Sequence, residues 1–387
     1  MSRGSIIKRG TSYTVKVELG PDPLTGKRRQ RWHSGYRTVK AAERARVDLL
    51  SKLDRGEYVE HTRQPLGDYL DDWLAAIEPT VRESTFYSYS RNLRLHVRPY
   101  IGGLLLAKVD AGALNGLYAT LLASGRKDGH QDHAGLSPRS VRYVHTILHR
   151  ALKDAVRWGR LARNPSDAAD PPRGGQESTP EVQAWPAHDL RRFLDTSKAT
   201  ADRYYPAWLF LATTGCRRGE ALGLRWSDLD LDGGRASIVQ TVVVVGHKVK
   251  LGAPKTARGR RAVSLDPSTV AELRAWKKRQ LEERMMLGSG YRDHGLVFAK
   301  VDGEPFHPER FSREFDRRVT RWHLPKLTLH GVRHTWATQA LQAGVHPRVV
   351  QERLGHSTIA VTLGIYSHVT ATLHDEAANL VASRFLG

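Results

Sequence analysis

The stretch "LTLHGVRHTWAT", Leu327 to Thr338, places two histidines and one arginine within a single predicted helix. His330 and Arg333 are three residues apart, so a helix presents both on one face. His330 and His334 are four apart, which is also the spacing of zinc ligands in metalloproteases. Those sites need a glutamate directly after the first histidine, and here that position is Gly331. The stretch therefore predicts an imidazole beside a guanidinium and argues against a zinc protease.

Three further stretches in the C-terminal half carry the same kinds of side chain. They are "TTGCRRGEALGLRWSDLD" with Arg217, Arg218 and Glu220, "APKTARGRRAVSL" with Lys255 at a hairpin turn, and "LGHSTIAVTLGIYSHV" with His356 and Tyr366. Taken singly, each residue has a simpler interpretation: a surface charge, a solvated lysine, a capping histidine or a core tyrosine. The combination of residue types is what favours phosphoryl transfer.

A phosphodiester under attack spreads negative charge over its nonbridging oxygens. Arginine binds such oxygens through a planar, always charged fork of N–H donors, so two arginines from different segments can hold one phosphate. A tyrosine hydroxyl, with a free pKa of about 10, becomes a nucleophile when a base takes its proton. A lysine or histidine can protonate the leaving oxygen. Because arginines can stabilise the developing charge, we expect neither a metal nor another cofactor.

The chain is strongly basic. Its 387 residues include 61 Lys and Arg against 40 Asp and Glu, a formal net charge of +21. Such a balance is typical of nucleic-acid-binding proteins, although a generally basic proteome is the simpler alternative. The single cysteine, Cys216, excludes an intramolecular disulfide. With no apolar signal core at its start and no apolar run near ~18 residues, we expect a cytoplasmic protein without a membrane partner.

Apolar periodicity and turn signals predict a multidomain chain. Residues 1–60 read as strands followed by a helix with Thr38 as its N-cap, a small α+β module. Residues 64–165 read as an all-α helical bundle, in which one helix is broken at Pro99 and Gly102 and another opens with Ser137 as N-cap and Pro138 in its first turn. Residues 166–181 are rich in Pro, Gly and Asp and predict a linker. Residues 182–387 predict a mainly α domain, interrupted between residues 236 and 265 by a small β-sheet or hairpin of two or three strands.

In order and in wording, the quoted stretches resemble the tyrosine recombinase, or phage integrase, family. The family pattern runs T-G-x-R-x-x-E, a hairpin lysine, H-x-x-R-H, L-G-H and a C-terminal I-Y. This chain carries "TGCRRGE", "PKTARGRR", "HGVRHTWAT", "LGHSTI" and "GIYSHV". The likeness runs from about Trp185 to the end and extends less specifically to the bundle, which resembles the family's core-site-binding domain. It implies a site-specific DNA recombinase that cleaves and rejoins DNA through a 3′-phosphotyrosyl intermediate.

The resemblance implies a phosphate clamp in the first and third motifs. Arg217 and Arg333 would be the two clamp arginines. Glu220 matches an acidic residue that supports the site. Arg218 falls on a variable position of the pattern, so no catalytic role is assigned to it.

The other matching residues would handle the tyrosine and the proton transfers. Tyr366 would be the nucleophile and Lys255 the general acid for the leaving 5′ hydroxyl. His330 matches a histidine near the attacking tyrosine and the scissile phosphate. His356 would donate a hydrogen bond to a phosphate oxygen.

The chain departs from the family pattern at two places. Gly331 and Val332 replace an acidic–aliphatic pair that is common between the histidine and the arginine. Gly364 stands two residues before Tyr366, where a polar residue is frequent. Because glycine weakens a helix by about 1 kcal/mol relative to alanine, we expect Tyr366 on a mobile segment.

The N-terminal module resembles, more loosely, the arm-type DNA-binding domain found in many integrases. Residues 1–63 hold 15 Lys and Arg against 7 Asp and Glu. A β-ribbon fits the major groove, and the segment "TGKRRQRW" would then supply the DNA contacts. The candidates are Lys27, Arg28, Arg29 and Arg31. A basic module that binds DNA without sequence preference is the open alternative.

The resemblance also implies partners and an assembly. The family acts as a tetramer on paired sites through a Holliday junction. We therefore expect double-stranded DNA with core-type and arm-type sites, a homotetramer on that DNA, and accessory DNA-bending or directionality proteins. The setting would be the nucleoid of a bacterial or phage-infected cell. The ending "HDEAANLVASRFLG" predicts a helix that packs either on a neighbouring protomer or on its own chain.

Integration or excision of a phage or other mobile element is thus the expected function. A transposase or a chromosome-dimer resolvase of the same chemistry is one alternative. A DNA-binding protein that does not cleave is the other, and the complete set of residue types argues against it.

Overall fold

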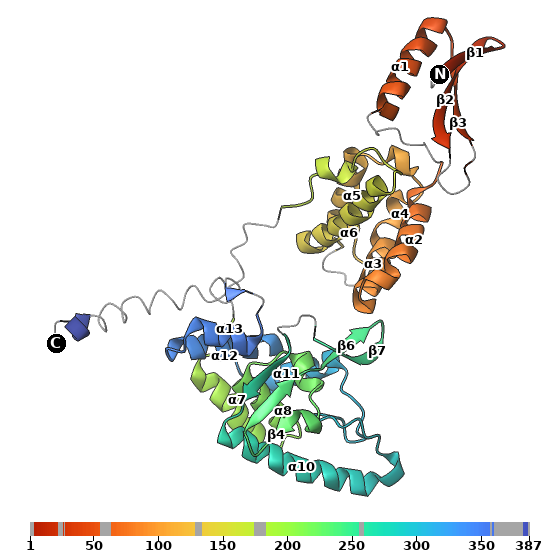
Figure 1. Cartoon of the computed structure of the whole chain (residues 1–387). Helices are drawn as coiled ribbons and strands as arrows, with labels where there is room; N and C mark the ends of the chain where they lie inside the picture. The colour runs from red at the N-terminus through yellow and green to blue at the C-terminus, as the bar shows by residue number, and fades with distance from the viewer. Residues whose placement is uncertain are drawn as a thin grey trace. The chain divides into compact units, whose positions relative to one another are not determined.

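The structure, a computed structural model, describes residues 4–21, 26, 28–54, 63–127, 134–173, 183–254, 259–356, 358–359 and 382–385. The chain divides into two compact units, Met1–Gly175 and Gln176–Gly387. The first holds a β-sheet with one helix and a separate set of helices, and the second is mainly helical with small sheets (Figure 1). This confirms the predicted fold class.

The N-terminal module is a three-stranded antiparallel sheet with one helix on it. Its elements are β1 (Gly4–Arg9), β2 (Ser12–Pro21), β3 (Arg28–Tyr36) and α1 (Val39–Asp54), with sheet order β1-β2-β3. The predicted cap of α1 is confirmed, because the Thr38 hydroxyl accepts a hydrogen bond from the Ala41 amide at 3.2 Å. Strand alternation turns Val15 and Val17 toward Ala42 of α1, and these three residues form a buried cluster.

The helical bundle follows. Its helices are α2 (Leu66–Ile77), α3 (Glu83–His96), α4 (Arg98–Ile101), α5 (Ala111–Ser124) and α6 (Pro138–Arg157). The predicted start of α6 is confirmed, since the Ser137 hydroxyl accepts from the Ser140 amide and Pro138 occupies the first turn. The break predicted at Pro99 falls earlier, at Val97, and the one predicted at Gly102 is confirmed as the end of α4. One apolar core unites the five helices.

The second unit is mainly helical, and its main described α-helices are α7 to α13. They are α7 (Ala187–Ala199), α8 (Tyr205–Thr214), α9 (Arg218–Leu222), α10 (Pro267–Leu287), α11 (Pro308–Arg321), α12 (Leu329–Gln342) and α13 (Pro347–Leu354). Aromatic rings from α7, α8 and α11 fill its core, with Trp208 and Phe311 at 4.5 Å and Phe193 and Phe315 at 5.0 Å between ring centroids.

The β-rich stretch of this unit holds more strands than its sequence suggests. β4 (Leu229–Asp230), β5 (Arg235–Ile238) and β8 (Arg261–Ser264) form one sheet, and β6 (Thr241–Val245) pairs with β7 (Lys248–Gly252) in a hairpin. The sequence predicted two or three strands here, and the described part of this stretch has four, β5 to β8. The unbroken run "ASIVQTVVVV" hides the boundary at Gln240, whose side-chain amide donates to the Gly223 carbonyl at 3.0 Å.

Two helix ends meet beside α12. Both α8 and α13 end in a glycine with left-handed backbone, Gly215 at φ 64° and Gly355 at φ 66°. A Cβ on Gly215 would lie 2.8 Å from the side chain of Leu354 and 3.0 Å from Trp336. Glycine is therefore required at this position by conformation and by space, and the carbonyl-bearing ends of α8 and α13 come together.

Candidate active site

Arg333 lies in the second turn of α12. Thr328 caps the start of this helix, because its hydroxyl accepts from the Gly331 amide at 3.2 Å. Only 4% of Arg333 is exposed. Its Nη1 donates to the Gly215 carbonyl at 2.9 Å and its Nη2 to the Leu354 carbonyl at 2.7 Å. These carbonyls end α8 and α13, where the helix dipole is negative. The helix ends therefore fix the orientation of the guanidinium.

Arg217 and Glu220 are joined at the start of α9. The Glu220 carboxylate, 3% exposed, accepts from the Arg217 amide at 2.9 Å and from Arg217 Nη1 at 2.8 Å. Arg217 Nη2 donates to the Gly355 carbonyl at 3.1 Å. The predicted clamp arginines and the predicted supporting carboxylate thus lie in one cluster.

Arg261 completes this cluster, and the sequence analysis did not single it out. Its Nη2 donates to Glu220 at 2.8 Å, and only 8% of its side chain is exposed. Burial alone would raise the pKa of Glu220, but the hydrogen bond and charge of Arg261, with those of Arg217, outweigh it and lower that pKa. Glu220 is therefore ionised at neutral pH and balances part of the cluster's positive charge.

Three arginine side chains bind three successive backbone carbonyls at the end of α13. The carbonyls of Arg353, Leu354 and Gly355 each accept an arginine N–H. The donors are, in the same order, Arg261, Arg333 and Arg217. Because the last carbonyls of a helix lack partners within that helix, they are available to anchor side chains, and this anchoring places His356 directly after the arginine cluster.

The two predicted histidines border the arginines. Burial, followed by the charges of Arg333 and Arg217, lowers the pKa of His356 to about 4, so its imidazole is neutral at pH 7. Burial and the neighbouring His334, whose ring lies 4.8 Å from that of His330 in an edge-on arrangement, lower the pKa of His330. These effects bring the pKa of His330 to about 4, so its imidazole is also neutral at pH 7.

Burial also lowers the pKa of Arg333, to about 10, and the nearby charge of Arg217 adds to this effect. The side chain remains protonated at neutral pH. The site therefore presents permanent positive charge beside neutral imidazoles, a combination suited to an anion with transferable protons.

Two predicted catalytic residues, Lys255 and Tyr366, lie outside the described residues, and so does Gly364. The structure does explain the other departure from the family pattern. A Cβ on Gly331 would lie 2.4 Å from the side chain of Leu327 and 3.2 Å from the Gln183 carbonyl. The start of α12 packs too closely against its neighbours for an acidic side chain at that position.

The predicted DNA contacts of the N-terminal module divide between two faces of its sheet. Arg28 pairs with Glu18 at 2.9 Å on the face away from α1. Arg29 and Arg31 alternate onto the opposite face, and Lys27 lies outside the described residues. All three described arginines are exposed.

The face of the sheet away from α1 carries a cationic aromatic group that the sequence analysis missed. Trp32 is 43% exposed. Arg9 lies 4.6 Å and Lys16 5.6 Å from the centroid of its ring. Strand pairing sets Lys16 opposite Trp32, and alternate positions on three strands, read together, could have revealed this cluster.

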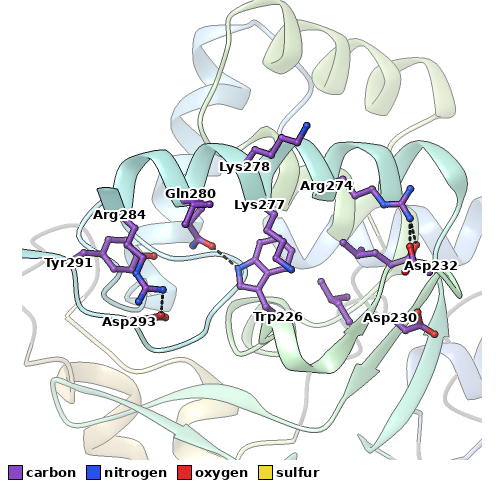
Figure 2. A pocket seen from close by; sticks show the side chains of 13 residues that line it. Trp226, Asp230, Asp232, Arg274, Lys277, Lys278, Gln280, Arg284, Tyr291 and Asp293 are labelled. Carbon is purple, nitrogen blue, oxygen red and sulfur yellow. Dashed lines mark hydrogen bonds and ion pairs between the residues drawn. The ribbon is translucent and has the colours of Figure 1, made fainter. Parts of the chain in front are cut away.

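A hollow of about 690 Å³ lies elsewhere in the second unit, along α10 (Figure 2). Its charged and polar groups are largely paired with one another. Arg274 binds Asp232 at 2.6 Å, and the Trp226 indole donates to Gln280 at 2.6 Å (Figure 2). None of the residues that line it belongs to the arginine cluster, so this hollow is not the candidate active site.

Among the described residues, no group of three or more His, Cys, Asp or Glu side chains is arranged to hold a metal ion. Within the same residues, no helix combines the length and apolar character that crossing a bilayer requires.

Comparison with known protein families shows where the arginine cluster and the two N-terminal parts of the chain have counterparts. The profile of the Phage integrase family matches residues 185–372, which include the whole arginine cluster. The chain belongs to the tyrosine recombinase (phage integrase) family. A profile of the integrase N-terminal SAM-like domain matches residues 66–114, and one of an Arm DNA-binding domain matches residues 5–53. The protein is therefore a site-specific recombinase of the integrase type, an enzyme that cleaves and rejoins DNA.

Relatives match along nearly the whole chain. A tyrosine recombinase XerC-like protein of Caldanaerobacter subterraneus subsp. tengcongensis is 25% identical, covering 98% of this chain and 98% of the relative. The ICEBs1 integrase of Bacillus subtilis is 24% identical, covering 95% and 96%.

Solved structures share the fold. The Tn1549 transposon integrase in complex with transposon right end DNA matches with a TM-score of 0.66 at 20% identity, covering 84% of this chain and 100% of that one. A lambda integrase tetramer bound to a Holliday junction matches with a TM-score of 0.54 at 15% identity, covering 94% of each chain.

Proposed function

We propose that this integrase cleaves duplex DNA by attack of Tyr366 on a phosphate held by Arg217 and Arg333, and so integrates or excises a mobile element. The observation that carries the proposal is the anchoring of both arginines on the end of one helix, beside His356. Two guanidinium groups that are fixed on a common support can bind one phosphate without reorganising.

The clamp keeps donors for its substrate. A guanidinium has five N–H groups, and to described partners Arg217 and Arg333 each donate two side-chain hydrogen bonds. The remaining N–H groups can bind nonbridging phosphate oxygens while the carbonyls keep the guanidinium planes in place. His356, neutral at pH 7, adds a further N–H donor.

The chemical step exchanges one phosphoester for another. The Tyr366 oxygen forms a bond to phosphorus as the bond from phosphorus to the 5′ oxygen breaks. His330, unprotonated near neutral pH, takes the phenolic proton, and the Lys255 ammonium gives a proton to the departing 5′ oxygen. The resulting 3′-phosphotyrosyl ester retains the bond energy, so a 5′ hydroxyl from another strand reverses the step without ATP.

The remaining domains would bring DNA to this site. We place the arm-binding domain at residues 1–60, the core-binding domain at 64–165, a linker at 166–181 and the catalytic domain at 182–387. The arm domain would contact DNA through the sheet face that carries Arg9, Lys16 and Trp32, because cations held over an exposed aromatic ring suit a phosphate backbone and a groove edge. The match to an Arm DNA-binding domain supports arm-type attachment sites.

Strand exchange between two duplexes requires four cleavages, and we propose a homotetramer on paired sites with a Holliday junction as intermediate. The lambda integrase of similar fold is a tetramer on such a junction. Accessory bending or directionality proteins would act on the same DNA, in the bacterial cytoplasm at the nucleoid.

The test uses the full chain and a nicked suicide substrate made from the ends of the element. Incubated in EDTA, the wild-type protein should form a covalent protein–DNA adduct, because the arginines supply the charge stabilisation. Tyr366→Phe should bind the DNA with similar affinity and form no adduct. An adduct in the Phe variant, or strict dependence of the wild-type reaction on Mg²⁺, would contradict the proposal.

A further inference from the structure

Arg261 is the most heavily engaged arginine of the cluster. It is the first residue of β8 and points toward the core, on the same strand face as the buried Val263. Its Nε donates to the Arg353 carbonyl at 2.5 Å and its Nη1 to the Gly259 carbonyl at 3.2 Å. Its Nη2 donates to the Glu220 carboxylate.

Arg261 differs from the clamp arginines in how many of its guanidinium N–H groups are already bound by the protein. Nη2 also lies 3.7 Å from the buried Cys216 sulfur. At least four of the five N–H groups that a guanidinium possesses therefore have protein partners. With 8% of its side chain exposed, Arg261 has neither the donors nor the access to bind a DNA phosphate in the way that Arg217 and Arg333 can.

The partners of Arg261 lie on two segments of the site, the start of α9 and the end of α13. Through Glu220 it holds the carboxylate that also binds Arg217. Through the Arg353 carbonyl it holds the end of α13, three residues before His356. A single side chain thus connects the start of α9 to the segment that carries His356.

Arg261 also follows closely on the segment of the proposed general acid. Lys255 precedes it by six residues in the sequence. A change at Arg261 would therefore disturb the start of α9 and the end of α13 together.

We propose that Arg261 is a positioning residue for strand cleavage, which sets Arg217 and His356 in register with each other without touching the phosphate. The inference rests on the proposed function, since it concerns the same reaction. Its physical basis is that a group held by buried, charge-assisted hydrogen bonds fixes its partners within a fraction of an ångström.

The experiment compares Arg261→Met and Arg261→Lys with a matched pair at Arg318. Arg318 is also a poorly exposed arginine of the second unit, bound to the Asp202 carboxylate at 2.6 Å, and none of its described partners is a site residue. For each variant we would measure the rate of adduct formation in a single turnover on the nicked substrate, the Kd for the same DNA, and the pH profile of the rate from pH 5 to 8.5.

Arg261→Met should slow adduct formation by roughly 10- to 100-fold, as other losses of an orienting partner do, with a Kd close to that of the wild type. The rate should also fall toward acid pH, because without Arg261 the pKa of Glu220 rises and its protonation releases Arg217. Arg261→Lys keeps a charge beside Glu220 but loses the fork, so it should restore the wild-type pH profile and only part of the rate. Both Arg318 variants should lose thermal stability and cleave at nearly the wild-type rate.

Three results would overturn the inference. Adduct formation at the wild-type rate by both Arg261 variants would show that the residue only stabilises the fold. An equal loss of rate in Arg318→Met would assign the effect to general destabilisation, and a Kd weakened in proportion to the rate would make Arg261 a DNA ligand. If Arg261→Met does not fold, an unchanged rate in Arg261→Lys is decisive. Absence of an adduct with the wild-type protein would instead refute the proposed function itself.

Discussion

Arginine serves two different purposes in the two units of this chain. In the second unit, Arg217, Arg261 and Arg333 are tied to backbone carbonyls, and two of them also bind the buried Glu220. In the N-terminal module the arginines of β3 are exposed, and the side chain of Arg28 is 66% exposed in its pair with Glu18. The same side chain is fixed in one region and solvated in the other.

The difference reflects what each region must do with a phosphate. A phosphate that reacts has to meet donors already in place, because reorganisation during the reaction raises the barrier. A phosphate that is only bound can be met by mobile cations, whose contribution is mainly electrostatic and depends on salt. Substitutions in the arginine cluster should therefore greatly lower the rate of cleavage and change DNA affinity little. Substitutions in the N-terminal sheet should moderately lower DNA affinity and leave the rate of cleavage unchanged.

The largest effect is expected for Arg333→Lys. Lysine keeps the charge but cannot bind the carbonyls of Gly215 and Leu354 and a phosphate in one plane. Loss of one preset donor typically costs about 10²- to 10³-fold in rate, so single-turnover adduct formation should fall by roughly that factor with little change in DNA affinity. A rate within threefold of the wild type would show that the fixed geometry of Arg333 is unimportant. The proposed difference between the fixed arginines of the cluster and the exposed arginines of the N-terminal sheet would then have no functional meaning.

A second effect concerns the buried carboxylate. Glu220→Gln leaves Arg261 with an uncompensated buried charge, which typically costs about 3–5 kcal/mol of stability. Calorimetry should show a lower transition temperature for the second unit only. Asp232→Asn, which breaks an ion pair whose carboxylate is 96% exposed, is the control and should leave both transitions unchanged. An unchanged second unit in Glu220→Gln would mean that the cluster does not depend on its one carboxylate.

A smaller effect is expected at the N-terminal sheet. Lys16→Ala removes a cation beside Trp32, so affinity for arm-site DNA should fall by about tenfold and the salt dependence of binding should decrease by about one ion. Cleavage of a core site should not change. Arg44→Ala removes one exposed charge from α1 instead and serves as the matched control. Equal losses in the two variants would indicate binding through overall charge and not through the sheet face.

The smallest effect is a pH dependence of stability in the second unit. The unfolded pKa of a histidine is about 6.5, and that of His356 in the folded chain is about 4. Between these values the unfolded chain binds a proton that the folded chain does not, so stability falls as pH drops from 6.5 toward 4. His330 and His334, whose pKa values are also lowered, act in the same direction.

Thermal unfolding at pH 7 and pH 5 checks this expectation. His356→Gln should lose part of the difference between the two pH values, and the transition of the N-terminal module provides the internal reference. An identical pH dependence in wild type and variant would show that His356 titrates normally in the folded chain.

Local signals allowed much of the fold to be predicted. The caps Thr38 and Ser137 depend on residues within one turn, and both are confirmed. The candidate site was found from spacing and family resemblance, and the structure brings Arg217, Glu220 and Arg333 together.

The sequence alone could not show which of several neighbouring arginines is buried in the site. Arg261 lies in the run "ARGRR", where no local feature separates this buried arginine from the exposed Arg260. Its partners are 41 residues away at Glu220 and 92 away at the Arg353 carbonyl, and a backbone carbonyl has no sequence signature. Alternation on β8, which sets Arg261 on the face of Val263, was the one available clue.

The most direct test of the account is to map the covalent adduct. Trypsin should release residues 354–384 from the trapped complex, a peptide that contains His356 and a single tyrosine, Tyr366. The account predicts that mass spectrometry finds the 3′-phosphoryl nucleotide on Tyr366 of this peptide. Attachment to any other residue, or cleavage with no protein-linked nucleotide, would contradict the claim that the arginine cluster holds a phosphate for this tyrosine.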